Sequence, residues 1–267
     1  MTLDPPPSLV PLTTLTGLPV WDASGHRTGW IRDVVARVGP EDARVTAVVF
    51  GDARDRWVVP WSDLDASDLD RLSLRHDAAK EPRASVPLES DELLLVRDVL
   101  DCRVYVVASR QIARVGEVWL EASPSEPPSV VGVEVGAGVL LRRLGPRRRR
   151  RPTSDVELLR LHDVHLVSGR GHIVQLSTDA SPARHLAPGD LAHLLTHLPA
   201  RLAADVLLRV PAGRSRAAVE HLHPRVRSHL GRALDGSRAP GRRFRRMAGW
   251  RLYRPEGDGR IDPMRHA

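Results

Sequence analysis

The chain has 267 residues, 42% hydrophobic and 4% aromatic, a composition typical of a globular protein with more than one modest domain. It contains no run of about 18 apolar residues, and its opening MTLDPPPSLV lacks the basic and apolar regions of a signal peptide. A single cysteine, Cys102, excludes an internal disulfide framework and a thiolate zinc cluster. We therefore expect a cytoplasmic protein without a transmembrane segment.

Charge is distributed unevenly along the chain. The formal net charge is +7, but residues 1–141 hold 14 Lys and Arg against 22 Asp and Glu, whereas residues 142–267 hold 26 against 11. An acidic first part and a strongly basic second part indicate either that the basic part binds an anionic partner or that the two parts contact each other.

The first elements predict a small β module over residues 12–96, after a proline-rich segment 1–11 that we expect to be disordered. Residues 18–38 have the pattern of a β-hairpin. Its turn is expected to use Gly25 for a positive φ, and Asp22 to bond back to the turn backbone. Short strands at residues 44–50 and 56–61 follow.

A second β module is expected over residues 97–170, because the first hairpin recurs at an offset of 84 residues. Val104 then matches Val20, and Glu117 matches Asp33. The copy lacks the Asp-x-x-Gly turn, which leaves its turn geometry open. Two related half-units predict one composite β architecture. An arginine-rich loop at residues 142–151 interrupts the second copy.

The order of these motifs resembles the PRC-barrel family, which is named after a photosynthetic reaction-centre subunit and also occurs in a ribosome maturation factor. The resemblance rests on Asp22 and Gly25, then on Gly29 and Asp33, and finally on VPWSDL at residues 59–64. It implies a small β barrel in which these residues build turns and strands, with no catalytic residues.

From residue 186 the apolar period changes from two residues to about 3.6, which predicts four short helices within a domain at residues 171–237. Leu191, Leu194 and Leu198, for example, are spaced as one helix face. Prolines stand near the start of each segment, where a missing N–H costs little. Helices of about ten residues are unstable alone, so we expect a superhelical array. The fold class is therefore α+β: two PRC-barrel-like antiparallel modules followed by short helices.

The helical segment resembles the intracellular N-terminal domain of the MgtE magnesium transporter family, through PGDLAHLLTHLP at residues 188–199 and LPARLAADVLLRV at residues 198–210. The resemblance implies a link to magnesium or other divalent-cation transport. It also makes Asp190 and Asp205 candidate Mg²⁺ ligands, although the many arginines around them oppose cation binding. The regulatory and pore domains of those transporters do not appear in the sequence.

Basic segments supply the candidate interaction residues. The loop at 142–151 and the tail at 238–267 have the composition of segments that dock on nucleic acid or on membrane head groups. Two other readings stay open: a solvated loop, and a tail packed back on the acidic modules. The candidate interaction residues are Arg147, Arg148, Arg149, Arg150, Arg151, Arg242, Arg243, Arg245, Arg246 and Trp250.

No catalytic constellation stands out. His193 and His197 have the spacing of two metal ligands on one helix, but no third ligand is placed by the sequence. Gly136 and Gly138 follow a strand without a complete phosphate-binding pattern, and no base is placed near Cys102. We therefore expect a non-enzymatic protein without a required cofactor.

The sequence as a whole predicts a cytoplasmic interaction or regulatory module, attached at most peripherally to the inner membrane. Its expected partner is another protein, such as a membrane cation transporter. The alternative is an RNA- or DNA-associated factor, similar to a ribosome maturation factor, that uses the basic C-terminal part.

Overall fold

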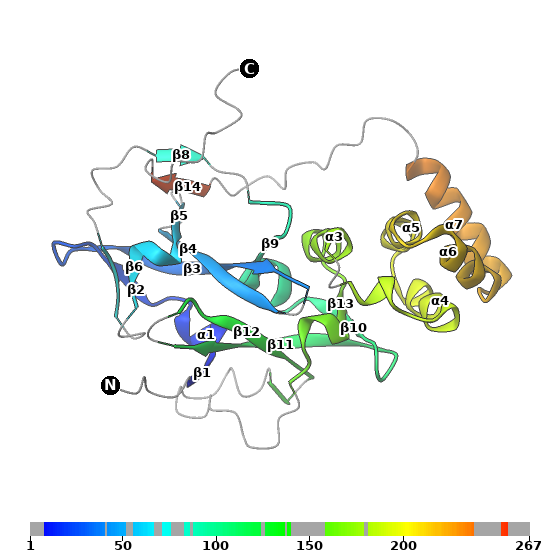
Figure 1. Cartoon of the computed structure of the whole chain (residues 1–267), viewed down its shortest axis with the longest axis horizontal. Helices are drawn as coiled ribbons and strands as arrows, with labels where there is room; N and C mark the ends of the chain where they lie inside the picture. Colours follow the sequence, from blue (N-terminus) through cyan, green and yellow to red (C-terminus); the bar gives the residue numbers. More distant parts are fainter. Residues whose placement is uncertain are drawn as a thin grey trace.

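A computed structural model of the chain shows an α+β protein, with a β body at one end and a group of helices at the other (Figure 1). No helix in the described part of the chain is long and apolar enough to cross a membrane. The structure describes residues 8–40, 42–51, 56–66, 71–75, 83–85, 88–123, 126–136, 138–139, 158–178, 181–237 and 252–255.

The elements follow one another as strands first and helices later. The strands are β1 (Ser8–Pro11), β2 (Pro19–Trp21), β3 (Arg27–Val38), β4 (Ala43–Gly51), β5 (Arg56–Pro60), β6 (Leu64–Asp65), β7 (Leu72–Leu74), β8 (Arg83–Ser85), β9 (Glu92–Leu94), β10 (Arg103–Val106), β11 (Gln111–Ala122), β12 (Ser129–Val135), β13 (Val164–Leu166) and β14 (Leu252–Pro255). The helices are α1 (Leu12–Leu15), α3 (Gly169–Ser177), α4 (Pro188–His197), α5 (Ala200–Arg209), α6 (Ala212–Glu220) and α7 (Pro224–Ser237), with shorter helical turns η1 (Trp61–Asp63), η3 (Leu95–Val99), η5 (Leu161–Asp163) and η6 (Pro182–Arg184).

Two β repeats make up the β body. The hairpin β2–β3 recurs as β10–β11, since β3 begins at Arg27 and β11 at Gln111, an offset of 84 residues. β4 and β12 occupy the next equivalent positions, and each pairs antiparallel with the long strand before it. The repeats join through β12 and β4, where Ser129 pairs with Arg44, so the strand order runs β13-β10-β11-β12-β4-β3-β2-β7-β6.

The repeats exchange their first strands. β1 pairs antiparallel with β11 of the second repeat, and β9 pairs antiparallel with β3 of the first repeat. The expectation that residues 1–11 form a disordered tail is therefore wrong for Ser8–Pro11, because the edge of β11 supplies backbone partners that a local pattern does not reveal. The expected boundary between residues 96 and 97 likewise divides η3, a turn that belongs with the second repeat.

Two buried acids reinforce this exchange. Asp33 on β3 accepts hydrogen bonds from the backbone N–H groups of Val96 (2.7 Å) and Arg97 (3.1 Å) in η3. Its counterpart Glu117 on β11 accepts from the backbone N–H of Thr13 in α1 (3.2 Å) and from the Thr13 hydroxyl. Each acid thus satisfies free N–H donors of a helical turn that precedes the other repeat.

The β repeats share one hydrophobic core. A single cluster of buried side chains draws on both repeats, including Val34 and Phe50 from the first and Val118 and Val133 from the second. β-branched valines dominate because they fit the pleated surface of paired strands. The expected single composite β architecture is the arrangement that we observe.

The helices form a second cluster with its own core, against which Tyr105 of β10 packs. Pro188 and Pro224 are the first residues of α4 and α7, while Pro199 and Pro211 cap α5 and α6, so each proline stands where no helical N–H is required. Helix α3 lies between the β body and α4–α7 (Figure 1). The apolar period did not predict it, because its half-polar sequence GRGHIVQLS has little amphipathic pattern.

Part of the C-terminal segment also contacts the β body. Leu252 and Tyr253 of β14 pair in parallel with β5, and β14 pairs antiparallel with β8. This pairing places one segment of residues 238–267 beside the acidic first repeat, which was one of the two expected arrangements.

Candidate interaction surfaces

The first hairpin turn has a purely structural geometry. Gly25 has a φ of 79°, and the Asp22 carboxylate accepts a hydrogen bond from the His26 backbone N–H at 2.8 Å. Gly29 lies against Gly51 of β4, where an added Cβ would stand 2.8 Å from the Gly51 Cα. Gly25 is therefore required by its positive φ, and Gly29 by the close approach of β4.

The equivalent turn in the second repeat contacts helix α4. Arg110 takes the left-handed conformation there, with a φ of 57°, and its guanidinium pairs with the Asp190 carboxylate of α4 at 2.5 Å. A short side chain would not span from this turn to α4. The loss of the Asp-x-x-Gly pattern thus coincides with a contact between the β body and the helices.

The two candidate Mg²⁺ ligands both lie in ion pairs. Asp190 pairs with Arg110, and Asp205 on α5 pairs with Arg209 at 3.8 Å. Among the described residues, no group of three or more His, Cys, Asp or Glu side chains is placed to hold a metal ion. A divalent cation at either aspartate would have to compete with a guanidinium, so the local chemistry opposes the Mg²⁺ expectation.

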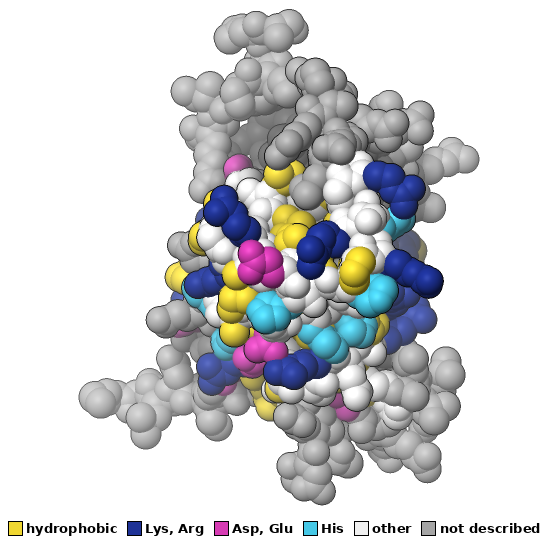
Figure 2. Space-filling view, turned by 90° about the vertical axis from the view of Figure 1, so that its right-hand side faces the viewer, with side chains coloured by type: hydrophobic (Ala, Val, Ile, Leu, Met, Phe, Trp, Pro, Cys, Tyr) yellow, Lys and Arg dark blue, Asp and Glu magenta, His cyan; other side chains and the backbone are white. Residues whose placement is uncertain are grey.

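Helices α5–α7 carry a basic surface, which we call the α5–α7 arginine surface. Six of its seven arginines are exposed and the seventh, Arg214, is half-buried. The one exposed acid on these helices whose side chain is described is Glu220. Figure 2 views this end of the molecule and shows arginine and histidine side chains spread over it. The arginines are Arg201, Arg209, Arg214, Arg216, Arg225, Arg227 and Arg232.

The interaction residues that the sequence predicted are not part of this surface as described. The arginines from Arg147 to Arg151, those from Arg242 to Arg246, and Trp250 all lie outside the described residues.

His193 and His197 form a stack on α4 that does not leave both side chains available. Their ring centroids are 4.5 Å apart, and His193 Nδ1 is hydrogen-bonded to the Tyr105 hydroxyl at 3.0 Å. The His197 Nδ1–H donates to the backbone carbonyl of His193 at 2.9 Å. Partial burial, with His197 and Arg110 nearby, lowers the pKa of His193. The stack therefore packs α4 against β10.

A buried histidine pair was not anticipated by the sequence analysis. His165 on β13 and His172 on α3 are both fully buried, and their Nε2 and Nδ1 atoms lie 2.8 Å apart. Burial, with the other histidine close by, lowers the pKa of His165 to about 3; burial, with Arg209 nearby, lowers that of His172 to about 4. A spacing of seven residues across a strand and a helix gives no local signal of this contact.

Cys102 is not a reactive thiol in this fold. Burial raises its pKa to about 12, and the charges of Asp98 and Asp101 act in the same direction. Since the thiolate is the nucleophilic form, this environment opposes catalysis.

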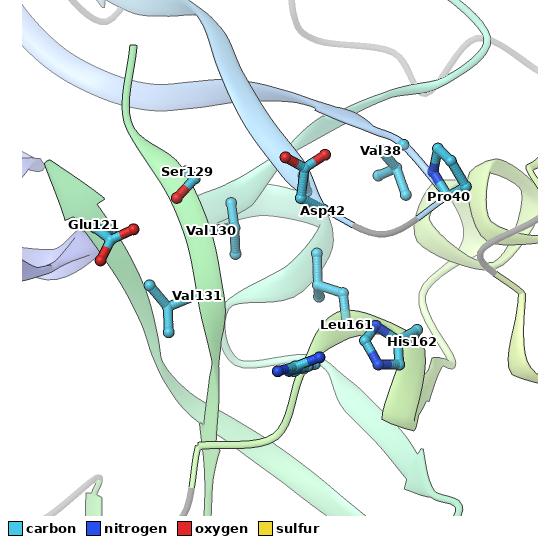
Figure 3. A pocket seen from close by; sticks show the side chains of 12 residues that line it. Val38, Pro40, Asp42, Glu121, Ser129, Val130, Val131, Leu161 and His162 are labelled. Carbon is cyan, nitrogen blue, oxygen red and sulfur yellow. The ribbon is translucent and has the colours of Figure 1, made fainter. Parts of the chain in front are cut away.

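A shallow cavity of about 260 Å³ lies where the β3–β4 turn meets β12 and η5. Figure 3 shows Glu121 on β11 and Asp42 just before β4, with Val130 between them. Asp42 is already paired with Arg44 at 2.9 Å. The polar groups therefore do not converge on one point, as a catalytic site would require.

The β2–β3 hairpin, with the residue that precedes the neighbouring strand β7, carries a further surface. We call it the arginine–tryptophan face; it consists of Trp21, Arg27, Trp30, Arg32 and Arg71. Both indole rings are half-buried. The Arg27 guanidinium lies 4.5 Å from the centre of the Trp30 ring, that of Arg32 5.8 Å from the same ring, and that of Arg71 5.5 Å from the Trp21 ring. The alternation of Trp30 and Arg32 on β3 was a signal for this face that the sequence analysis did not use.

Comparison with known proteins leaves this geometry as the main guide to function. No family matches. Neither the models of known protein families nor the curated proteins contain a match to the chain.

Proposed function

We propose that the chain is a non-enzymatic interaction module that binds an acidic protein surface through the α5–α7 arginine surface. The observation that carries this proposal is the excess of exposed arginines over acids on these helices. Asp190 and Asp205 are engaged by Arg110 and Arg209. Arg216 and Arg225, in contrast, are exposed and form no ion pair with another described residue. Such a field favours anionic partners.

The two family resemblances suggest which partner to look for. The paired β repeats are compatible with PRC-barrel-like modules, and the proline-started helices with an MgtE-like N-terminal domain. On that basis we propose that the partner is the cytoplasmic part of a membrane cation transporter, supplied by another chain. Mg²⁺ is not part of the proposal as a ligand of this chain, because both candidate aspartates are paired with arginines.

The second candidate is an RNA- or DNA-associated factor. It is favoured by the concentration of basic residues in 142–267, whose arginine runs would release counterions from phosphates. Binding of this type falls steeply with salt and disappears when nucleic acid is digested, which separates it from binding to a protein.

The test compares two charge-reversal variants of the full chain in pull-downs from detergent extracts of native cells, with and without nuclease. R216E/R225E reverses two exposed charges on the helices. R103E/R160E changes the net charge equally but on exposed residues of the β body. We expect a nuclease-resistant partner that the first variant loses and the second retains. With the purified partner, the first variant should bind at least about tenfold more weakly, since each buried or rim charge pair contributes on the order of 1 kcal/mol. Equal capture by both variants would refute the proposal.

A further inference from the structure

The hairpin β2–β3 lies at the opposite end of the β body from helices α4–α7 (Figure 1). Its arginine–tryptophan face is therefore a second surface, separate from the α5–α7 arginine surface. From the side chains gathered there we propose that this face binds single-stranded nucleic acid. Bases would stack on Trp21 and Trp30, and the arginines would contact phosphates.

The backbone places both rings on the same side of the hairpin. Pro19 pairs with Trp30, and Trp21 pairs with Arg27, with a bulge between Val20 and Trp21. The bulge shifts the alternation by one residue, so that Arg27 lies over the same face as Trp30 instead of the opposite one. Arg27 is therefore paired with Trp21 across the hairpin, while its guanidinium lies over the ring of Trp30.

Among the described residues, no acid pairs with the charges on this face. Arg27, Arg32 and Arg71 form no ion pair with any described residue, and Arg32 only donates from Nε to the Gly51 carbonyl at 3.1 Å. Two other arginines of the first repeat are neutralised, since Arg37 pairs with Asp91 and Glu92 and Arg44 pairs with Asp42. Within the described residues, three arginines without an ion pair beside two tryptophans form a local positive surface.

This combination fits single-stranded nucleic acid better than other partners. Aromatic rings stack on any exposed base, while arginines contact the backbone and add cation–π contacts. An acidic protein would use the arginines but would not need two flat rings. A duplex hides its bases and would meet only the charges. Every base has a flat face that can stack and every nucleotide a phosphate, so the expected binding is tolerant of sequence.

The experiment uses the full chain in a W250F background, which removes the tryptophan of the C-terminal segment. Oligo(U) and oligo(dT) of about 12 nucleotides are titrated while tryptophan fluorescence and anisotropy are followed. Variant W21L/W30L removes the rings, and R27Q/R71Q removes two charges but keeps the rings. R103Q/R160Q, with equal charge loss elsewhere on the β body, is the matched control. Circular dichroism and thermal melting verify that each variant is folded.

We expect fluorescence quenching on binding, and a loss of affinity of at least about tenfold in W21L/W30L, as base stacking on aromatic rings contributes strongly per base. R27Q/R71Q should lower the slope of log affinity against log salt by about 1.4, since each phosphate contact in a single strand contributes about 0.7. The control should bind as the parent does.

Either of two outcomes would overturn the inference: no binding by the parent chain at low salt, or equal binding by the parent and both face variants. The second outcome would assign nucleic-acid binding to the basic segments instead. The inference is independent of the proposed protein partner, because R216E/R225E leaves this face unchanged. That variant should show the same fluorescence quenching by the oligonucleotides as the parent chain.

Discussion

The exchange between the two repeats depends on Asp33, so its replacement offers the most direct test of the fold. One carboxylate oxygen, Oδ1, accepts from the backbone N–H groups of Val34 and Val96, and the other, Oδ2, accepts from that of Arg97. Asp33→Ala leaves three buried donors without acceptors, at about 1 to 3 kcal/mol each, or about 3 kcal/mol at the lower limit. Asp33→Asn keeps an oxygen at the Oδ1 position and loses one bond, about 1 kcal/mol.

The assay is urea denaturation of both variants, read as the free energy of unfolding at constant m-value. The acid adds a pH dependence. Burial raises the pKa of Asp33 to about 7, against the opposing effect of its backbone hydrogen bonds. A group whose pKa is raised on folding contributes stability that is present below its unfolded pKa of 3.8 and is lost as pH rises toward 7.

The deficit of Asp33→Asn relative to the parent should therefore shrink between pH 5 and pH 7, by at most about 1.4 kcal/mol per pH unit. Equal losses in the alanine and asparagine variants, or no loss in either, would refute the role of this acid in joining the repeats. The equivalent pair Glu117→Ala and Glu117→Gln provides an internal comparison in the second repeat.

Three further predictions address other contacts. Because burial lowers the pKa values of His165 and His172, the contribution of this pair to the free energy of unfolding should be complete above pH 6.5 and should fall as pH drops toward 4; a double leucine variant should lack this contribution to the pH dependence in urea titrations. The free energy of unfolding of Arg110→Gly should exceed that of Arg110→Ala by about 1 kcal/mol, since both variants lose the ion pair but only glycine relieves the positive φ. Gly29→Ala should lower the melting temperature strongly, whereas Gly189→Ala, at an open position in α4, should raise it slightly.

Local patterns predicted the elements well. The turn chemistry at Asp22 and Gly25 marked the first hairpin, and the 84-residue offset marked the second. Prolines and the leucine period marked α4 to α7. These signals succeed because turn conformation and amphipathic faces are properties of short segments.

Contacts between distant segments were not predictable in the same way. The pairing of Ser8–Pro11 with β11 depends on a strand edge more than 100 residues away. The ion pair of Arg110 with α4 and the contact between His165 and His172 likewise join elements that come together only in the folded chain. The candidate interaction residues came from arginine runs that lie outside the described residues. In the arginine–tryptophan face, the alternation of Trp30 and Arg32 is visible in the sequence, whereas the position of Arg27 depends on the bulge in β2–β3.

The exchange of first strands between the repeats also constrains how the polypeptide folds during its synthesis. β1 is made before its partner β11, which emerges only after about 110 further residues, so β1 stays unpaired until the second repeat is made. A nascent first repeat has a vacant edge on β3 until β9 is synthesised. The same crossing suggests an evolutionary origin: a strand-swapped homodimer, fused head to tail by gene duplication, would produce this connectivity without rearranging a single contact.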